Sequence, residues 1–152
     1  MKTVQLLNYT LLVDREATKH VYNGVKAGGS ETCACEFCHN YIQSRETAFS
    51  SELINLFDRV GIDYKKDYEV VYLGPEEDGL FLYSTWFDFV GSIISPIGEK
   101  TVNNHEVWSS NLSVKISEVA LPVESHFHHS GYAVVELNIL LKLPWTITDS
   151  SQ

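Results

Sequence analysis

Apolar and polar residues alternate over the last regular stretch of the chain, from Tyr132 to Leu143, and this pattern constrains the fold most. In an extended chain, one face would carry Ala133, Val135, Leu137, Ile139, Leu141 and Leu143. The other face would carry Glu136, Asn138 and Lys142, with Val134 and Leu140 among them. A period of two predicts a strand with one buried face. Pro144 ends it, because proline has no amide hydrogen to donate to a sheet.

Further strands are predicted over residues 3–13, 18–25, 68–73, 80–89 and 111–119, and helices over 35–47 and 51–60. The strand 80–89 is expected to continue to residue 94 after a bend at Gly91, and residues 96–110 are expected to be irregular. Helices early and strands late argue against alternating β-α-β units. We therefore expect an α+β fold in a single domain of residues 1–152. It would be a mainly antiparallel sheet of five to seven strands, with two helices packed on one face or end.

The helix over 51–60 has clear signals at both ends. Ser50 or Ser51 can cap its first turn, and Gly61 can end it in the left-handed conformation. Its apolar residues follow helical spacing, at Leu53, Leu56, Phe57 and Val60. We expect this stripe to face the core.

All three cysteines of the chain lie close together, at Cys33, Cys35 and Cys38. An odd number of cysteines cannot all pair within one chain, and the C-x-x-C spacing suits a metal or a redox pair. If a helix begins near Cys35, then Cys35, Cys38 and His39 share one face. Three thiolates and one imidazole would form a tetrahedral zinc shell. The fourth ligand could instead come from Glu124, His126, His128 or His129.

Two other interpretations of the cysteines stay open. Reduced cysteines often pack as small apolar residues in a core. A redox or nucleophilic role would need a nearby base, and the proximity of His39 in sequence does not establish that geometry.

A second polar cluster runs from Glu124 to His129. In a strand, Glu124, His126 and His128 would point to one side, as a ligand set suited to zinc or iron. The alternative is an exposed loop between two strands, with Ser130 and Gly131 in its turn.

The cysteine run Cys33-x-Cys35-x-x-Cys38-x-Asn40 is followed by the helix with Leu53, Leu56 and Phe57, by Gly61-Ile62-Asp63, and finally by Leu143-Pro144-Trp145. In this order the segments resemble a family of small, uncharacterised bacterial proteins. The resemblance spans most of the chain. It implies a bacterial cytosolic protein and no particular catalytic residue.

The chain has 20 acidic and 11 basic residues and a net charge of −9. Such a surface repels nucleic acid and suits a basic protein partner. No stretch approaches the roughly 18 apolar residues that a membrane span needs. Clustered, unpaired cysteines suit a reducing compartment, so we expect a cytoplasmic protein.

Together these features favour a non-enzymatic binding or interaction module, of immunity or adaptor type, with a structural zinc site at the cysteines. The alternative is a metal-dependent enzyme that uses Glu124, His126 and His128.

Overall fold

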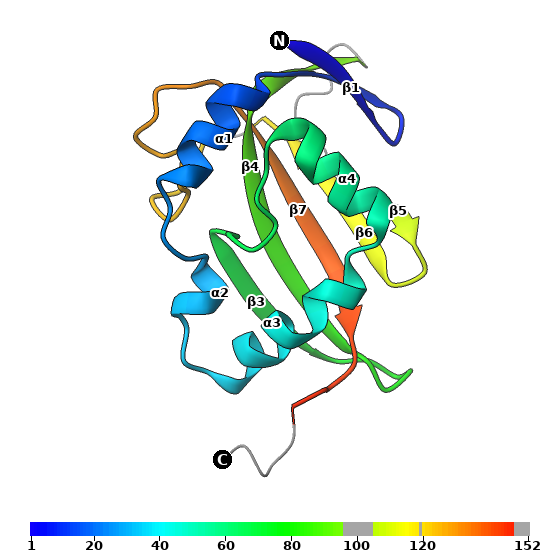
Figure 1. Ribbon diagram of the computed structural model, residues 1–152. Helices are drawn as coiled ribbons and strands as arrows, with labels where there is room; N and C mark the ends of the chain where they lie inside the picture. Colours follow the sequence, from blue (N-terminus) through cyan, green and yellow to red (C-terminus); the bar gives the residue numbers. More distant parts are fainter. Residues whose placement is uncertain (96–104, 119, 148–152) are drawn as a thin grey trace.

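The computed structural model describes residues 1–95, 105–118 and 120–147 (Figure 1). Within these residues the chain forms one antiparallel sheet of seven strands. The strands are β1 (Lys2–Leu6), β2 (Tyr9–Val13), β3 (Glu69–Pro75), β4 (Phe81–Ser95), β5 (Glu106–Ser109), β6 (Leu112–Ser117) and β7 (Val134–Leu143). Their order is β1-β2-β4-β7-β6-β5, and β3 also pairs with β4.

The long strand β4 organises the sheet. Along one edge it pairs with β7, from Phe81 opposite Leu143 to Val90 opposite Val134. Along its other edge it pairs first with β3 and then, from Gly91 onward, with β2. The predicted strands over 68–73, 80–94 and 132–143 are therefore confirmed, and so is the strand that begins near residue 111. Residue 119, the end of that last prediction, lies outside the described residues.

In the described ranges the helices are α1 (Arg15–Asn23), α2 (Gly29–Thr32), α3 (Glu36–Ala48) and α4 (Ser51–Val60). Figure 1 shows α3 and α4 lying across the same face of the sheet. The α+β class and the two predicted helices are confirmed; α1 and α2 are additional. No helix in this part of the chain is long and apolar enough to cross a bilayer.

Aromatic residues fill the space between α3, α4 and the sheet. Phe57 is fully buried and its ring centroid lies 5.1 Å from that of Phe87 on β4 and 5.7 Å from that of Phe49. Ser50 caps α4 by accepting from the amide of Leu53, and Gly61 ends it at φ +91°. The predicted stripe of α4 thus forms the helix side of the core.

The predicted single strand over 3–13 is wrong, because the segment folds back on itself as the hairpin β1–β2. Leu6 pairs with Tyr9 across a two-residue turn in which Leu7 takes φ +53°. The buried positions change at this turn from even numbers, Val4 and Leu6, to odd numbers, Tyr9 onward. The turn lacks the glycine that would have identified it in the sequence.

The predicted strand over 18–25 is also wrong, because this segment forms the helix α1. Asp14 accepts a hydrogen bond from the amide of Ala17 at 3.1 Å, which caps the first turn. Thr18 and Tyr22, one turn apart, are the buried residues of the helix. The helical spacing of Thr18 and Tyr22 and the Asp14 cap are the sequence signals from which a helix could have been predicted. The strand β5 was likewise missed within the segment expected to be irregular.

The sheet face opposite α3 and α4 carries an acidic pair, of which Asp88 is buried and Glu136 is half-buried. Asp88 on β4 lies opposite Glu136 on β7 and is 1 % exposed. The hydroxyl of Ser125 donates to Asp88, and the hydroxyl of Tyr68 donates to Glu136 at 2.7 Å. Burial raises the pKa of Asp88 to about 8, and the nearby charge of Glu136 adds to this rise.

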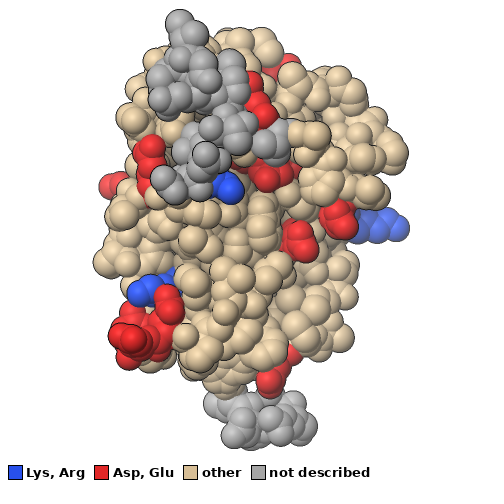
Figure 2. All heavy atoms as spheres, turned by 180° about the vertical axis from the view of Figure 1, so that it is seen from behind, with Lys and Arg blue, Asp and Glu red and all other residues tan. Residues whose placement is uncertain are grey.

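Figure 2 views the molecule from behind, and the acidic side chains visible there are dispersed among uncharged residues. On this view they do not form one continuous patch. The excess of acidic residues is therefore spread over the surface that can be seen.

Candidate metal centre

The three cysteines lie where α2 ends and α3 begins. Cys33 follows the last residue of α2, and Cys35 occupies the N-cap of α3. The sulfur of Cys35 accepts from the amide of Cys38 at 3.4 Å, so a thiol takes the capping role that a hydroxyl or carboxylate usually fills. This turn brings both ends of the cluster toward one point.

The three sulfur atoms all lie within 4.8 Å of one another. Cys33 and Cys35 are exposed, Cys38 is buried, and the Sγ atoms of Cys33 and Cys35 are 3.1 Å apart as unpaired thiols. Sulfur atoms around a tetrahedral zinc ion, each about 2.3 Å from the metal, would lie about 3.8 Å apart. The cluster could therefore hold a metal ion with small side-chain adjustments.

The thiols have different tendencies to ionise. Hydrogen bonds from the backbone amide of Cys35 and from the neighbouring thiols lower the pKa of Cys33. Burial raises the pKa of Cys38 well above its ordinary value, and the hydrogen bonds to the other two thiols add to this. A metal cation would therefore meet a readily formed thiolate at the surface and would have to displace a proton from the buried thiol.

A buried carboxylate holds α2 in place. The side chain of Asp67 accepts from the amide of Ser30 at 3.0 Å and from its hydroxyl at 2.7 Å. The amide of Gly29 donates to the carbonyl of Asp67 at 2.8 Å. A Cβ atom at Gly28 or Gly29 would come within 2.7 Å of a backbone oxygen, so this close approach requires glycine. The glycine pair therefore forms a packed contact with the segment around Asp67.

Asn40 holds the opposite side of the turn. It is fully buried, its amide nitrogen donates to the carbonyl of Pro144 at 3.0 Å, and its oxygen accepts from the amide of Thr146 at 2.7 Å. Trp145 packs against the ring of Phe37 with centroids 5.8 Å apart. The cysteine run and the Leu143-Pro144-Trp145 segment, distant in sequence, therefore meet in space.

His39 is not brought into the cluster. It is exposed, and its Nε2 atom lies 3.4 Å from the side-chain nitrogen of Gln43. Among the described residues, the three cysteines form the only group of three or more candidate ligands close enough to share an ion, and His39 is not part of it.

The interpretation of Glu124, His126 and His128 as one face of a strand is wrong, because residues 123–130 form a series of turns. Glu124 and His128 are exposed. The Nε2 atom of His126 donates to the backbone carbonyls of Lys66 and Asp67, at 3.0 and 3.1 Å. The ring of His129 lies beside that of His128, with centroids 4.5 Å apart. The alternative of a loop between strands is confirmed.

Sequence reasoning found the thiols but missed Asp67, the residue that positions α2. Its partner Ser30 lies 37 positions earlier in the chain, so no local pattern joins the two. Fold and cluster together define an α+β protein with a three-thiol candidate metal centre at a helix junction. Comparisons with known protein families, with curated proteins and with solved structures found no match.

Proposed function

We propose that this protein is a non-enzymatic interaction module in which Cys33, Cys35 and Cys38 bind one zinc ion as a structural staple. The observation that carries the proposal is the convergence of the three sulfur atoms within 4.8 Å of one another. Three thiolates suit zinc better than the harder cations that prefer oxygen ligands. The fourth position is open to water or to His39, whose exposed side chain lies one turn after Cys35.

The staple role rests on where the thiols lie. They join the end of α2 to the start of α3, and they share this junction with the buried residues Asp67 and Asn40. A bound ion would cross-link α2, a helix of 4 residues with few hydrogen bonds of its own, to the first turn of α3. Binding to the folded state alone would then raise the free energy of unfolding.

Metal analysis of protein purified without a histidine tag and without chelators tests this proposal. We expect one zinc per chain, its loss in Cys38→Ser, and a lower melting temperature after that loss. Zinc affinity should rise with pH, because binding displaces thiol protons. His128→Ala is the matched control and should keep the ion. Metal-free protein as stable as zinc-loaded protein would contradict the proposal.

The variant His39→Ala distinguishes a site with His39 as the fourth ligand from a site with water as the fourth ligand. If His39 is the fourth ligand, zinc affinity falls in this variant and the spectrum of a cobalt-substituted site changes. If water is the fourth ligand, neither changes. The second result would give an open coordination position, which is the feature that an enzyme rather than a staple needs.

The partner that we propose is a basic protein, in a bacterial cytoplasm. The net charge of −9 supports a basic partner. The resemblance of the cysteine run and the Leu143-Pro144-Trp145 segment to small bacterial proteins supports a bacterial cytoplasm. Association should slow steeply with salt, since exposed charges are screened beyond about 8 Å at physiological ionic strength. Capture from an extract of the source cells that yields no basic protein at low salt would argue against such a partner.

A further inference from the structure

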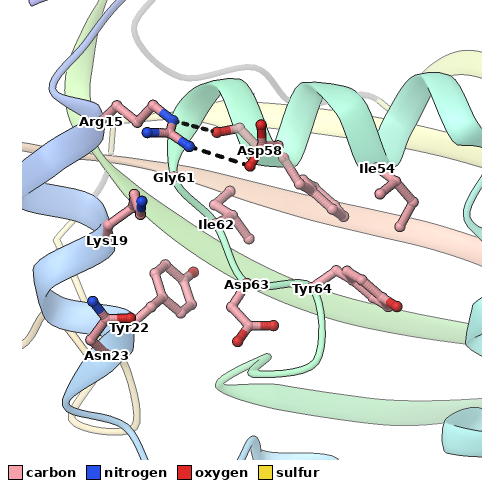
Figure 3. Close-up of a pocket in the computed structure, with 11 residues that line it drawn as sticks. Arg15, Lys19, Tyr22, Asn23, Ile54, Asp58, Gly61, Ile62, Asp63 and Tyr64 are labelled. Atoms are coloured by element: carbon pink, nitrogen blue, oxygen red, sulfur yellow. Dashed lines mark hydrogen bonds and ion pairs between the residues drawn. The ribbon is translucent and has the colours of Figure 1, made fainter.

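A hollow of about 320 Å³ lies between α1, α4 and the turn that follows α4, away from the cysteines (Figure 3). Its size is at the lower end of the range for pockets that hold small molecules. Arg15 on α1 closes one end, because its guanidinium donates to the backbone carbonyl of Asp58 at 2.7 Å and pairs with the Asp58 carboxylate at 3.3 Å.

The hollow has an apolar floor and a polar rim. Ile54, Phe57 and Ile62 line it together with the rings of Tyr22 and Tyr64, and Figure 3 shows Tyr22 and Ile62 pointing into the space. Both tyrosine hydroxyls already donate elsewhere, Tyr22 to the carbonyl of Asp88 at 2.8 Å and Tyr64 to Glu46 at 2.6 Å. The half-buried ring of Tyr64 therefore offers apolar surface but no free hydroxyl to a ligand, whereas Tyr22 is 2 % exposed and lies beneath the hollow.

The charges around the hollow leave one cation uncompensated. Asp58 pairs with Arg15, and Asp63 accepts from the amide of Lys65 at 3.0 Å and lies 3.8 Å from the ammonium of Lys66. Lys19 is half-buried and makes no hydrogen bond or ion pair with any residue that the structure describes. One free ammonium group beside an apolar floor would favour a ligand that carries a single negative charge.

We infer that this hollow is a binding site for a small carboxylic acid with an apolar body, whose carboxylate pairs with Lys19 and whose body packs on Ile54, Ile62 and Tyr64. The occupant is a monoanion, because a second negative charge would meet Asp58 and Asp63 at the rim. This site is independent of the zinc proposal, since none of its lining residues belongs to the α2–α3 junction.

Nuclear magnetic resonance titration with hydrocinnamate tests the inference, with the isosteric uncharged hydrocinnamide and the cationic phenylpropylamine as comparisons. We expect amide shifts at Gly61, Ile62 and Asp63, and binding of the acid roughly three- to tenfold tighter than binding of the amide. The amine should bind most weakly. High salt should narrow the difference between acid and amide, because it screens the Lys19 charge.

Two variants locate the effect. Lys19→Gln should make acid and amide bind equally, whereas Lys26→Gln, at an exposed lysine of the same segment, should leave the preference unchanged. Ile54→Trp should fill the hollow and weaken both probes, and an unchanged fold is checked by the spectrum outside the site. The inference is overturned if neither probe binds at millimolar concentration, if the shifts lie elsewhere, or if Lys19→Gln keeps the preference for the acid.

Discussion

Replacing Asp88 by asparagine should remove a large part of the pH dependence of stability. Asp88 is 1 % exposed and lies opposite Glu136, and its Oδ1 atom is buried without a hydrogen-bond partner among the described residues. Its pKa is raised from an ordinary 3.8 to about 8, chiefly by burial. Folded protein therefore keeps a proton on Asp88 in a pH range where the unfolded chain has lost it.

The sign of the effect follows from this difference. Below about pH 4 the carboxyl is protonated in both states, and its contribution to stability is fully present. As the pH rises toward about 8, folding must retain a proton that the unfolded chain releases, so stability falls. A pKa difference of this size corresponds to on the order of 5 kcal/mol of unfolding free energy across the range.

Asparagine has nearly the same shape and no charge. Its side-chain oxygen can still accept from the Ser125 hydroxyl, and its amide group can donate toward Glu136. Denaturant melts of wild type and Asp88→Asn at a series of pH values measure the effect. We expect the variant to gain stability relative to wild type by several kcal/mol between about pH 4 and pH 8.

Asp78→Asn is a control for which the pH dependence of stability should have the opposite sign. Asp78 is exposed, and the ion pair with Lys142 and the hydrogen bond from the amide of Leu80 lower its pKa. Its stabilising contribution is present at neutral pH and is lost as the pH falls through the lowered pKa. A difference between wild type and Asp88→Asn that stays constant with pH would refute the assignment of a buried, protonated Asp88.

Two further substitutions test the core and the support of the cysteines. Phe57→Ala should lower the unfolding free energy by about 3–5 kcal/mol, since the ring is fully buried against Phe49 and Phe87. Denaturant melts measure this loss, and a loss below about 1 kcal/mol would show that the apolar stripe of α4 is not part of a tight core. Asp67→Ala should weaken zinc binding by roughly 10–100-fold in a competition assay with a chelator. The substitution removes the hydrogen bonds that hold α2 and does not replace any of the three cysteines. Unchanged zinc affinity in that variant would mean that the cysteine turn is rigid without Asp67.

Much of the architecture follows from local patterns. Helix α4 has its cap, its apolar stripe and its terminal glycine within a dozen residues, and β7 alternates along its whole length. These features depend on neighbours in sequence, so they could be predicted without knowing the rest of the fold. The α+β class follows from them, because segments of both kinds must bury one face each.

Other features depend on residues far apart in sequence. The turn at Leu7 lets β2 pair with β4, where Val13 lies opposite Gly91. Helix α1 has local signals in its Asp14 cap and its Thr18–Tyr22 spacing, but its place on the sheet depends on the hydrogen bond from Tyr22 to the backbone of Asp88, 66 positions away. Both placements depend on tertiary contacts that no local pattern shows.

The candidate metal site likewise combines features set by local sequence with features set by distant residues. The C-x-C-x-x-C spacing keeps the three thiols within at most about 17 Å of one another, the length of five extended residues, and the helical turn that starts at Cys35 brings the sulfurs within 4.8 Å. Contacts between distant segments place the ring of His126 against backbone carbonyls, while His39 lies beside Gln43 and outside the cluster. Such contacts also place Asp67 and Asn40 on the two sides of the cysteine turn. Spacing in sequence limits only how far apart residues can be, whereas orientation and hydrogen-bond partners are set by segments that meet after folding.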